Sequence, residues 1–200
     1  MYNFFLVTVL LFILNSHTIA SNSSNHRIAV LVNDQMITSY DIVQRIKMNA
    51  ILNGVNITPE NNEEFVKIVI DELIKETLKN EKIEEYKIVI SDDEYLKYEF
   101  NFYQNIKLDK NNIQKMFETN DIKYDEIENF LTHELSWQKL VSKMFYRLTS
   151  TSEIEIEEIM LNSENITEGI AKNIIIQKQL DLKSNKMIRD LFNEATIEYK

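Results

Sequence analysis

The sequence predicts a mainly α-helical fold with a small β-sheet, and three features support this. Only 2 of the 200 residues are Gly and 1 is Pro, and so few breakers favour long helices over a many-turned β fold. Apolar residues recur at helical spacing along most of the chain. Strand-like runs lie near the two ends, at 28–37 and 195–200.

The first of these runs reads as a strand, a tight turn and a second strand. Residues 28–32 form an apolar β-branched run, which fits a strand buried on both faces. Asn33 and Asp34 tolerate positive φ and can close a two-residue hairpin, after which Met36 and Ile37 return. Because a two-stranded hairpin is marginal alone, we predict that the final run pairs with it.

The first twenty residues have the layout of a secretory signal peptide. They contain no charged side chain, and 4–14 is almost wholly apolar. Thr18 and Ala20 then supply small residues at the −3 and −1 positions of a cleavage site. An uncleaved anchor is the alternative, and in both cases the rest of the chain is exported. Residues 21–26 are expected to be a flexible leader.

Helix boundaries are predicted from caps and apolar spacing. Thr38 with Asp41, and Ser91 with Glu94, have the spacing of capping boxes, and Gly54 suits a helix end. The expected helices are 41–52, 61–86 (the longest), 92–106, 109–117, 124–148, 152–160, 170–182 and 185–194. They divide into a helical domain over 27–160 and a C-terminal helix and strand over 161–200 that pack back on it.

Composition excludes several chemistries. The chain has no Cys, so disulfides and thiolate sites are excluded. Its net charge of −10 argues against nucleic acid as a partner and is interpreted as a contribution to solubility. His17, His26 and His133 have no ligand-like spacing. No nucleophile is paired with a base, and no catalytic, cofactor-binding or metal-binding residue is predicted.

The remaining charged motifs have structural interpretations. Residues 92–94 are expected to cap a helix, because carboxylates are favoured at a helix N-terminus. The glutamates of 153–158 are expected to form a solvated face, and His133 with Glu134 a surface pair on one helix. Trp137 is expected in the core, with its indole N–H bonded to a backbone acceptor.

An aromatic stretch in helix 92–106 carries the strongest functional hint. The stretch consists of Tyr95, Tyr98, Phe100, Phe102 and Tyr103. These five side chains cannot all face inward, because positions 98, 100 and 102 span much of the helix circumference. Either the helix is buried on two sides, or it lines an apolar groove that holds unfolded chains. On the second interpretation, the candidate peptide-binding residues are Tyr95, Tyr98, Phe102, Tyr103, Met116, Phe117 and Met144.

The order and spacing of several segments resemble the periplasmic chaperone SurA family, in its alphaproteobacterial form. The segments are 37–42 leading to Arg45-Ile46, 71–74 with Leu78, 88–94, 133–141 with Phe145, and 189–199. No single motif is diagnostic, but together they cover nearly all of the mature chain.

This resemblance implies a helical core built from both chain ends, with parvulin-type prolyl isomerase domains inserted between them. Only about 160–170 could carry the insertion here, and a domain needs on the order of a hundred residues. The chain therefore resembles the chaperone core alone, and no isomerase activity is inferred.

The family implies an ATP-independent periplasmic holdase. Its partners would be unfolded outer-membrane proteins and the outer-membrane barrel assembly machinery. A second copy of the chain, in a homodimer, is a further candidate partner. An adaptor that binds one folded partner is the alternative function, and a prolyl isomerase is the third.

Overall fold

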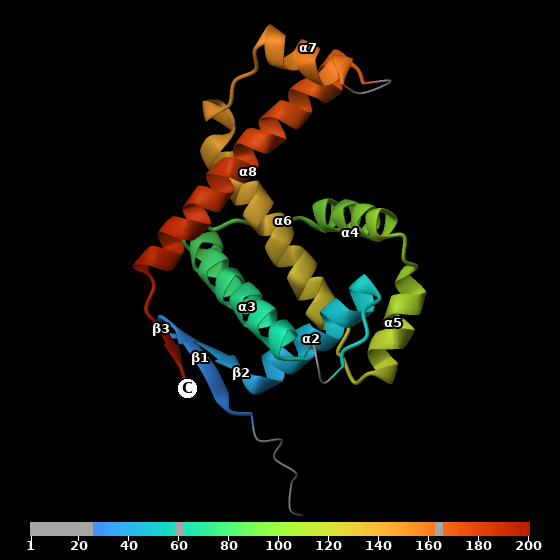
Figure 1. The fold of residues 1–200 in the computed structure, drawn as a ribbon, viewed down its shortest axis with the longest axis vertical. Coiled ribbons are helices and arrows are strands. Elements are labelled where there is room, and N and C mark those ends of the chain that lie inside the picture. Colours follow the sequence, from blue (N-terminus) through green and yellow to red (C-terminus); the bar gives the residue numbers. More distant parts are fainter. Residues whose placement is uncertain (1–25, 59–61, 163–165) are drawn as a thin grey trace, which may run out of the picture.

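The computed structural model describes residues 26–58, 62–162 and 166–200. The predicted signal peptide and most of the leader lie outside these residues. The elements are β1 (Ile28–Val32), β2 (Gln35–Thr38), α2 (Ser39–Asn53), α3 (Asn62–Glu85), α4 (Asp92–Ile106), α5 (Lys110–Thr119), α6 (Asp125–Phe145), a 3-10 helix η1 (Tyr146–Leu148), α7 (Glu153–Leu161), α8 (Glu168–Glu194) and β3 (Ile197–Tyr199). The predicted class, mainly α with a small sheet, is confirmed (Figure 1).

The sheet joins the two ends of the described chain, as predicted. Its strand order is β2-β1-β3, and both pairs are antiparallel. At the hairpin turn Asn33 has φ 52°. Its N–H donates to the carbonyl of Thr196 at 2.8 Å, and its side-chain oxygen accepts from the Thr196 N–H at 3.0 Å. The hairpin turn itself therefore holds the start of the final strand.

One detail of the sheet was predicted wrongly. Strand β1 is not buried on both faces: Val30 and Val32 are buried, whereas Leu31, which lies between them on the opposite face, is only partly buried. Alternate side chains of a strand point to opposite faces, and only one face of this sheet packs on the main core.

The predicted helix starts lie within two residues of the observed ones, except the start at 185, which falls inside α8. Local caps fix several of these starts. Thr38, Ser91 and Ser152 each form a capping box, and Gly54 ends α2 with φ 62°. The helix lengths differ more from the predicted ones than the starts do. The longest helix is α8, with 27 residues against 24 in α3, since the expected break near 183–184 is absent. Helix α6 ends at Phe145, and η1 follows.

Two separate hydrophobic clusters make up the body. The main core lies between the sheet, α2, α3, α6 and α8, and the second between α2, α4, α5 and α6. Helices α2 and α6 contribute to both: Trp137 and Leu140 of α6 belong to the first, and Ile127 and Leu131 to the second. These two helices therefore hold the α4–α5 unit to the rest.

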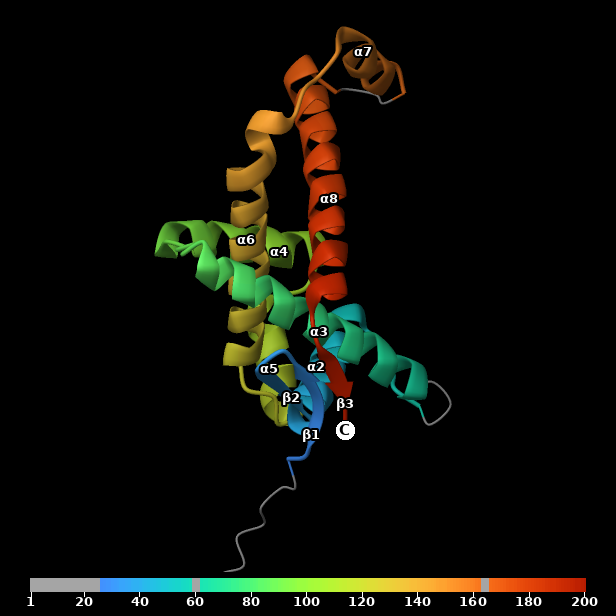
Figure 2. The same cartoon turned by 90° about the vertical axis from the view of Figure 1, so that its left-hand side faces the viewer.

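Helix α8 extends beyond the body. Figures 1 and 2 both show α7 and the start of α8 at the end of the molecule that lies away from the sheet. We call α7 together with residues 168–181 of α8 the arm. Its core is small: Ile156, Ala171 and Ile175 are buried there, and Ile159 and Ile166 pack against them. No helix among the described residues has the length and hydropathy to span a membrane.

Trp137 joins α6 to α8. It is 3% exposed, which confirms its predicted place in the core. Its indole N–H, however, donates to Oγ of Ser184 at 2.9 Å rather than to a backbone carbonyl. Carbonyls inside helices are already bonded to the same helix, so a side chain of the neighbouring helix serves instead.

The Ser184→Ala variant tests this link. Without the hydroxyl, the buried indole N–H has no partner, and the free energy of unfolding should fall by about 1–3 kcal/mol. Urea unfolding followed by circular dichroism measures the change. Ser142→Ala is the matched control, because the Ser142 hydroxyl makes no hydrogen bond to the described residues, and it should cost less than about 0.5 kcal/mol. Equal stability of the two variants would contradict the proposed role of the bond.

Candidate functional site

A cleft of about 370 Å³ opens between α2, α3, α4 and α6. It lies beside the joint between the two hydrophobic clusters. Its lining residues are Arg45, Asn49, Leu52, Asn53, Glu72, Lys75, Glu76, Lys79, Phe102, Ile106, Phe130 and Glu134. Its two sides differ in chemistry: α3 supplies only charged side chains, whereas α4 supplies only apolar ones.

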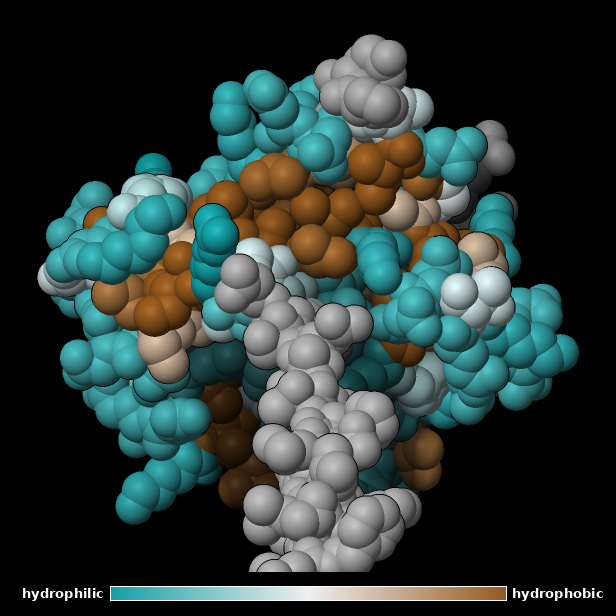
Figure 3. All heavy atoms as spheres, turned by 90° about the horizontal axis from the view of Figure 1, so that it is seen from below, coloured by the Kyte–Doolittle hydropathy of each residue, from teal (hydrophilic) through white to brown (hydrophobic). Residues whose placement is uncertain are grey.

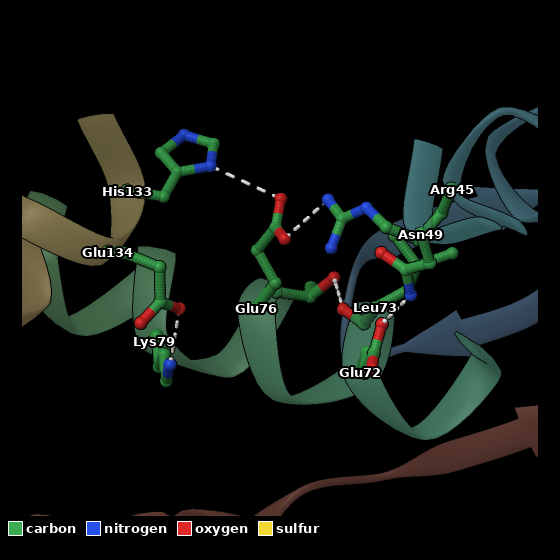
Figure 4. Close-up of polar contacts among 9 residues, drawn as sticks. Arg45, Asn49, Glu72, Leu73, Glu76, Lys79, His133 and Glu134 are labelled. Carbon is green, nitrogen blue, oxygen red and sulfur yellow. Dashed lines mark hydrogen bonds and ion pairs between the residues drawn. The ribbon is translucent and has the colours of Figure 1, made fainter. Parts of the chain in front are cut away.

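Glu76 is the centre of the charged side. One carboxylate oxygen accepts from Nη2 of Arg45 at 2.6 Å, and the other lies 3.2 Å from Nδ1 of His133. Figure 4 shows this carboxylate of α3 between the Arg45 side chain of α2 and the His133 ring of α6. A single residue therefore links three helices at the base of the cleft.

The electrostatics of Glu76 follow from these contacts. Burial by itself raises the pKa of this carboxyl, but the His133 hydrogen bond and the charge and hydrogen bond of Arg45 outweigh burial. Its pKa therefore lies below the ordinary value of 4.5, and the group is ionised at neutral pH. Burial of a charge is tolerated when it is paired in this way.

Two further contacts cross the cleft. Nζ of Lys79 lies 2.7 Å from a carboxylate oxygen of Glu134, and Nδ2 of Asn49 donates to Glu72 at 2.7 Å (Figure 4). Lys79 also lies 5.8 Å from the centre of the Trp137 ring. Within the described part of the chain, Lys75 makes no ion pair, and the carboxylate of Glu72 bonds only to the neutral amide of Asn49. The cleft therefore retains one cation and one anion without an opposite charge.

The opposite side of the cleft is apolar. Phe102 and Ile106 come from α4, Phe130 from α6 and Leu52 from α2, and all four pack partly against the second cluster. The Arg45 guanidinium lies 5.1 Å from the centre of the Phe130 ring, a cation–π distance. The cleft can therefore bind an apolar side chain on one side and hydrogen-bond a polar group on the other.

The structure separates the seven predicted peptide-binding residues. Phe102 lies in the cleft. Tyr95 and Tyr98 are half-buried on α4, and the Tyr98 hydroxyl accepts from Gln138 of α6 at 3.1 Å. Phe117 is 0% exposed and Tyr103 is also buried in the second cluster, so both act in core packing. Met116 is exposed on α5, away from the cleft.

The seventh residue, Met144, lies elsewhere. It lines a shallow groove with Tyr86, which directly follows α3, and with Met187 of α8, and it packs on the main core. The structure therefore does not assemble the predicted group into one surface, and only Phe102 reaches the cleft.

Sequence reasoning missed most of the cleft. Arg45 and Glu76 were not predicted as functional, although Arg45 is a charged residue one position before the apolar Ile46 in α2, which is a usable signal. His133 and Glu134 do not pair with each other: each bonds to α3 instead. Phe100 was in the aromatic stretch but not among the candidates, and it is 64% exposed on the outer face of α4.

Apolar surface also gathers at the sheet end of the molecule. Figure 3, the view from below, shows a band of hydrophobic residues there. The exposed large hydrophobic residues of β1, β2, α2 and the first half of α3 are Ile28, Met36, Val43 and Ile68.

No group of three potential metal-ligating His, Cys, Asp or Glu residues occurs in the described part of the chain.

Comparison with protein families decides the assignment. The SurA-like N-terminal domain family matches residues 1–141. The chain belongs to this family. The match confirms the resemblance seen in the sequence, and it includes α2, α3, α4 and all but the last residues of α6, the elements that form the cleft.

Two other comparisons add less. A solved structure from Campylobacter jejuni, reported for two structurally related SurA-like chaperones that include the virulence factor PEB4, matches with a TM-score of 0.42 and 14% identity. The match covers 86% of this chain and 98% of that one. Curated proteins give no match.

The Glu76→Gln variant tests the charged side of the cleft at neutral pH. It leaves the buried Arg45 without a counter-charge, and the free energy of unfolding should fall by about 3 kcal/mol. Urea unfolding at about pH 7 measures the loss. Glu157→Gln is the control, because this exposed carboxylate makes no ion pair with a described residue, and it should change little.

The pH dependence gives a second prediction. Because the folded pKa of Glu76 lies below its unfolded value, the stability it contributes is present above about pH 4.5 and is lost as the pH falls through the lowered pKa. The difference in the free energy of unfolding between wild type and Glu76→Gln should therefore shrink as the pH falls from about 5 to about 3. A gap that stays constant in acid would show that the carboxylate charge is not the cause.

Proposed function

We propose that this chain is a chaperone that holds unfolded exported proteins, with outer-membrane proteins as clients. The observation that carries this proposal is the two-sided cleft, which lies within the part of the chain that matches the SurA-like family. The signal-like first twenty residues agree with action in the periplasm.

The cleft suits an extended peptide with alternating side chains. Successive side chains of a strand point to opposite sides. One row would meet Phe102, Ile106 and Phe130, and the other would meet the charged side chains of α3. Outer-membrane barrel strands alternate between apolar and polar residues in this way. The polar side of the cleft would also bond the unpaired backbone groups of an unfolded client.

Such binding needs no ATP. The chaperone would lower the free concentration of the unfolded client by mass action and so slow its aggregation. A cleft of this size holds only a few side chains, so each contact would be weak, and repeated motifs along one client would raise the overall affinity.

Prolyl isomerase activity does not form part of the proposal. Only residues 162–167 separate α7 from α8, whereas a parvulin-type domain needs on the order of a hundred residues. The adaptor alternative stays in the test below as an outcome.

Light scattering tests the holdase proposal. Residues 21–200 would be added at increasing ratios to an outer-membrane barrel protein diluted from urea, with an unrelated acidic helical protein as control. Suppression of scattering at near-stoichiometric ratios is expected. No suppression, together with stoichiometric co-purification of one folded protein, would favour the adaptor instead.

A pair of neighbouring phenylalanines locates the binding surface. Phe102 lies in the cleft, whereas Phe100, two residues away on α4, is exposed outside it. Phe102→Ala should weaken client binding by roughly tenfold, the loss expected for one buried aromatic contact. Phe100→Ala should leave binding within about twofold. Fluorescence anisotropy with a labelled barrel-strand peptide measures both, after circular dichroism has confirmed folding. The reverse ranking would place the client on the outer face of α4.

A further inference from the structure

The arm exposes more large apolar side chains than its small core buries. Ile154 is 78% exposed and Leu161 is 87% exposed, both on α7. Ile170 and Ile174 of α8 are also exposed. Met160 of α7 is exposed as well. Isolated exposed apolar residues are ordinary on a protein surface, but five of them within the arm point to an interaction surface.

The apolar residues of α7 lie on one face with an acidic residue between them. Ile154, Glu158 and Leu161 are spaced by four and three positions, so they share one side of the helix. Glu158 makes no ion pair with a described residue. The exposed face of α7 is therefore apolar at both ends and negative in the middle.

The ridge on α8 has the complementary character. Ile170, Ile174 and Lys178 are spaced by four positions, and all three are exposed. Within the same chain Lys178 faces Glu155: it helps to lower the pKa of that carboxyl, after the two Ser152 hydrogen bonds. It has no ion pair within 4.0 Å among the described residues, so it remains available to a second carboxylate.

We propose that the arm is a homodimer interface, in which the α7 face of one copy packs on the α8 ridge of the other. Glu158 then pairs with Lys178 of the partner copy, and the exposed apolar residues of the two faces pack beside that pair. A two-fold axis makes the same contact twice and closes the assembly.

Charge favours this contact, between α7 of one copy and α8 of the other, over a contact between the two α7 helices. Helix α7 carries four glutamates and no basic residue, so two copies of it face to face would repel each other. The arm offers fewer residues than the 20–30 per side of a standard stable interface. The dimer is accordingly weak, with dissociation in the range of about 1–100 µM.

This inference does not depend on the chaperone proposal, because the arm lies outside the cleft and beyond the residues that match the family. A dimer would nevertheless place two clefts in one assembly, which increases affinity for a client with repeated motifs.

Sedimentation velocity on residues 21–200 over about 1–200 µM tests the proposal. The weight-average sedimentation coefficient should rise with concentration from the monomer value toward that of a dimer. Glu158→Lys and Lys178→Glu should each raise the protein concentration at the midpoint of dimer formation by at least tenfold. The reason is that each variant places like charges together at both contacts. The double variant Glu158→Lys/Lys178→Glu should restore the midpoint to within about threefold of wild type.

Glu63→Lys is the matched control. It makes the same change in net charge at an exposed position in α3, and it should leave the midpoint unchanged. Circular dichroism confirms that each variant folds. A monomer at every concentration, or a dimer that Glu158→Lys does not weaken, would overturn the proposal. Loss of client protection by Glu158→Lys while wild type is monomeric would instead assign the face to the client.

Discussion

The fold depends on the antiparallel pairing of the first and last strands. Strand β1 lies between β2 and β3, so the end of the chain completes the sheet that covers the main core. This pairing also positions one end of α8. From the sheet, α8 runs past Trp137 of α6 and continues beyond the body as part of the arm. A helix of 27 residues spans about 40 Å, so one element connects the sheet, the core and the proposed dimer surface.

The cleft exists because charged groups hold its three main helices together where apolar packing stops. Glu76 bonds to Arg45 and His133, and Lys79 bonds to Glu134. Buried charges are stable only with a partner in good geometry, so these contacts fix how α2, α3 and α6 lie relative to one another. They also leave the apolar side of α4 uncovered. Structural and binding roles thus meet in the same residues of α3.

The aromatic stretch of α4 shows how far sequence reasoning reaches. Helical spacing correctly indicated that its members could not all face inward. It could not tell which side would meet the second cluster, because periodicity gives the angle between side chains and not the identity of their neighbours. Tyr103 proved to be buried, Phe102 lines the cleft and Phe100 is exposed. Met116 and Met144 were grouped with them by residue type alone, and the structure places them elsewhere.

The sequence by itself determined most of the helix starts, the hairpin and the family. Capping boxes and turns depend on residues three or four positions apart, so a short window contains all their partners. Only the tertiary structure decided the cleft, the partner of Trp137 and the exposed face of the arm. Glu76 and His133 are 57 positions apart, and Trp137 and Ser184 are 47. Contacts at such separations are chosen by the packing of whole helices, and no local pattern specifies them.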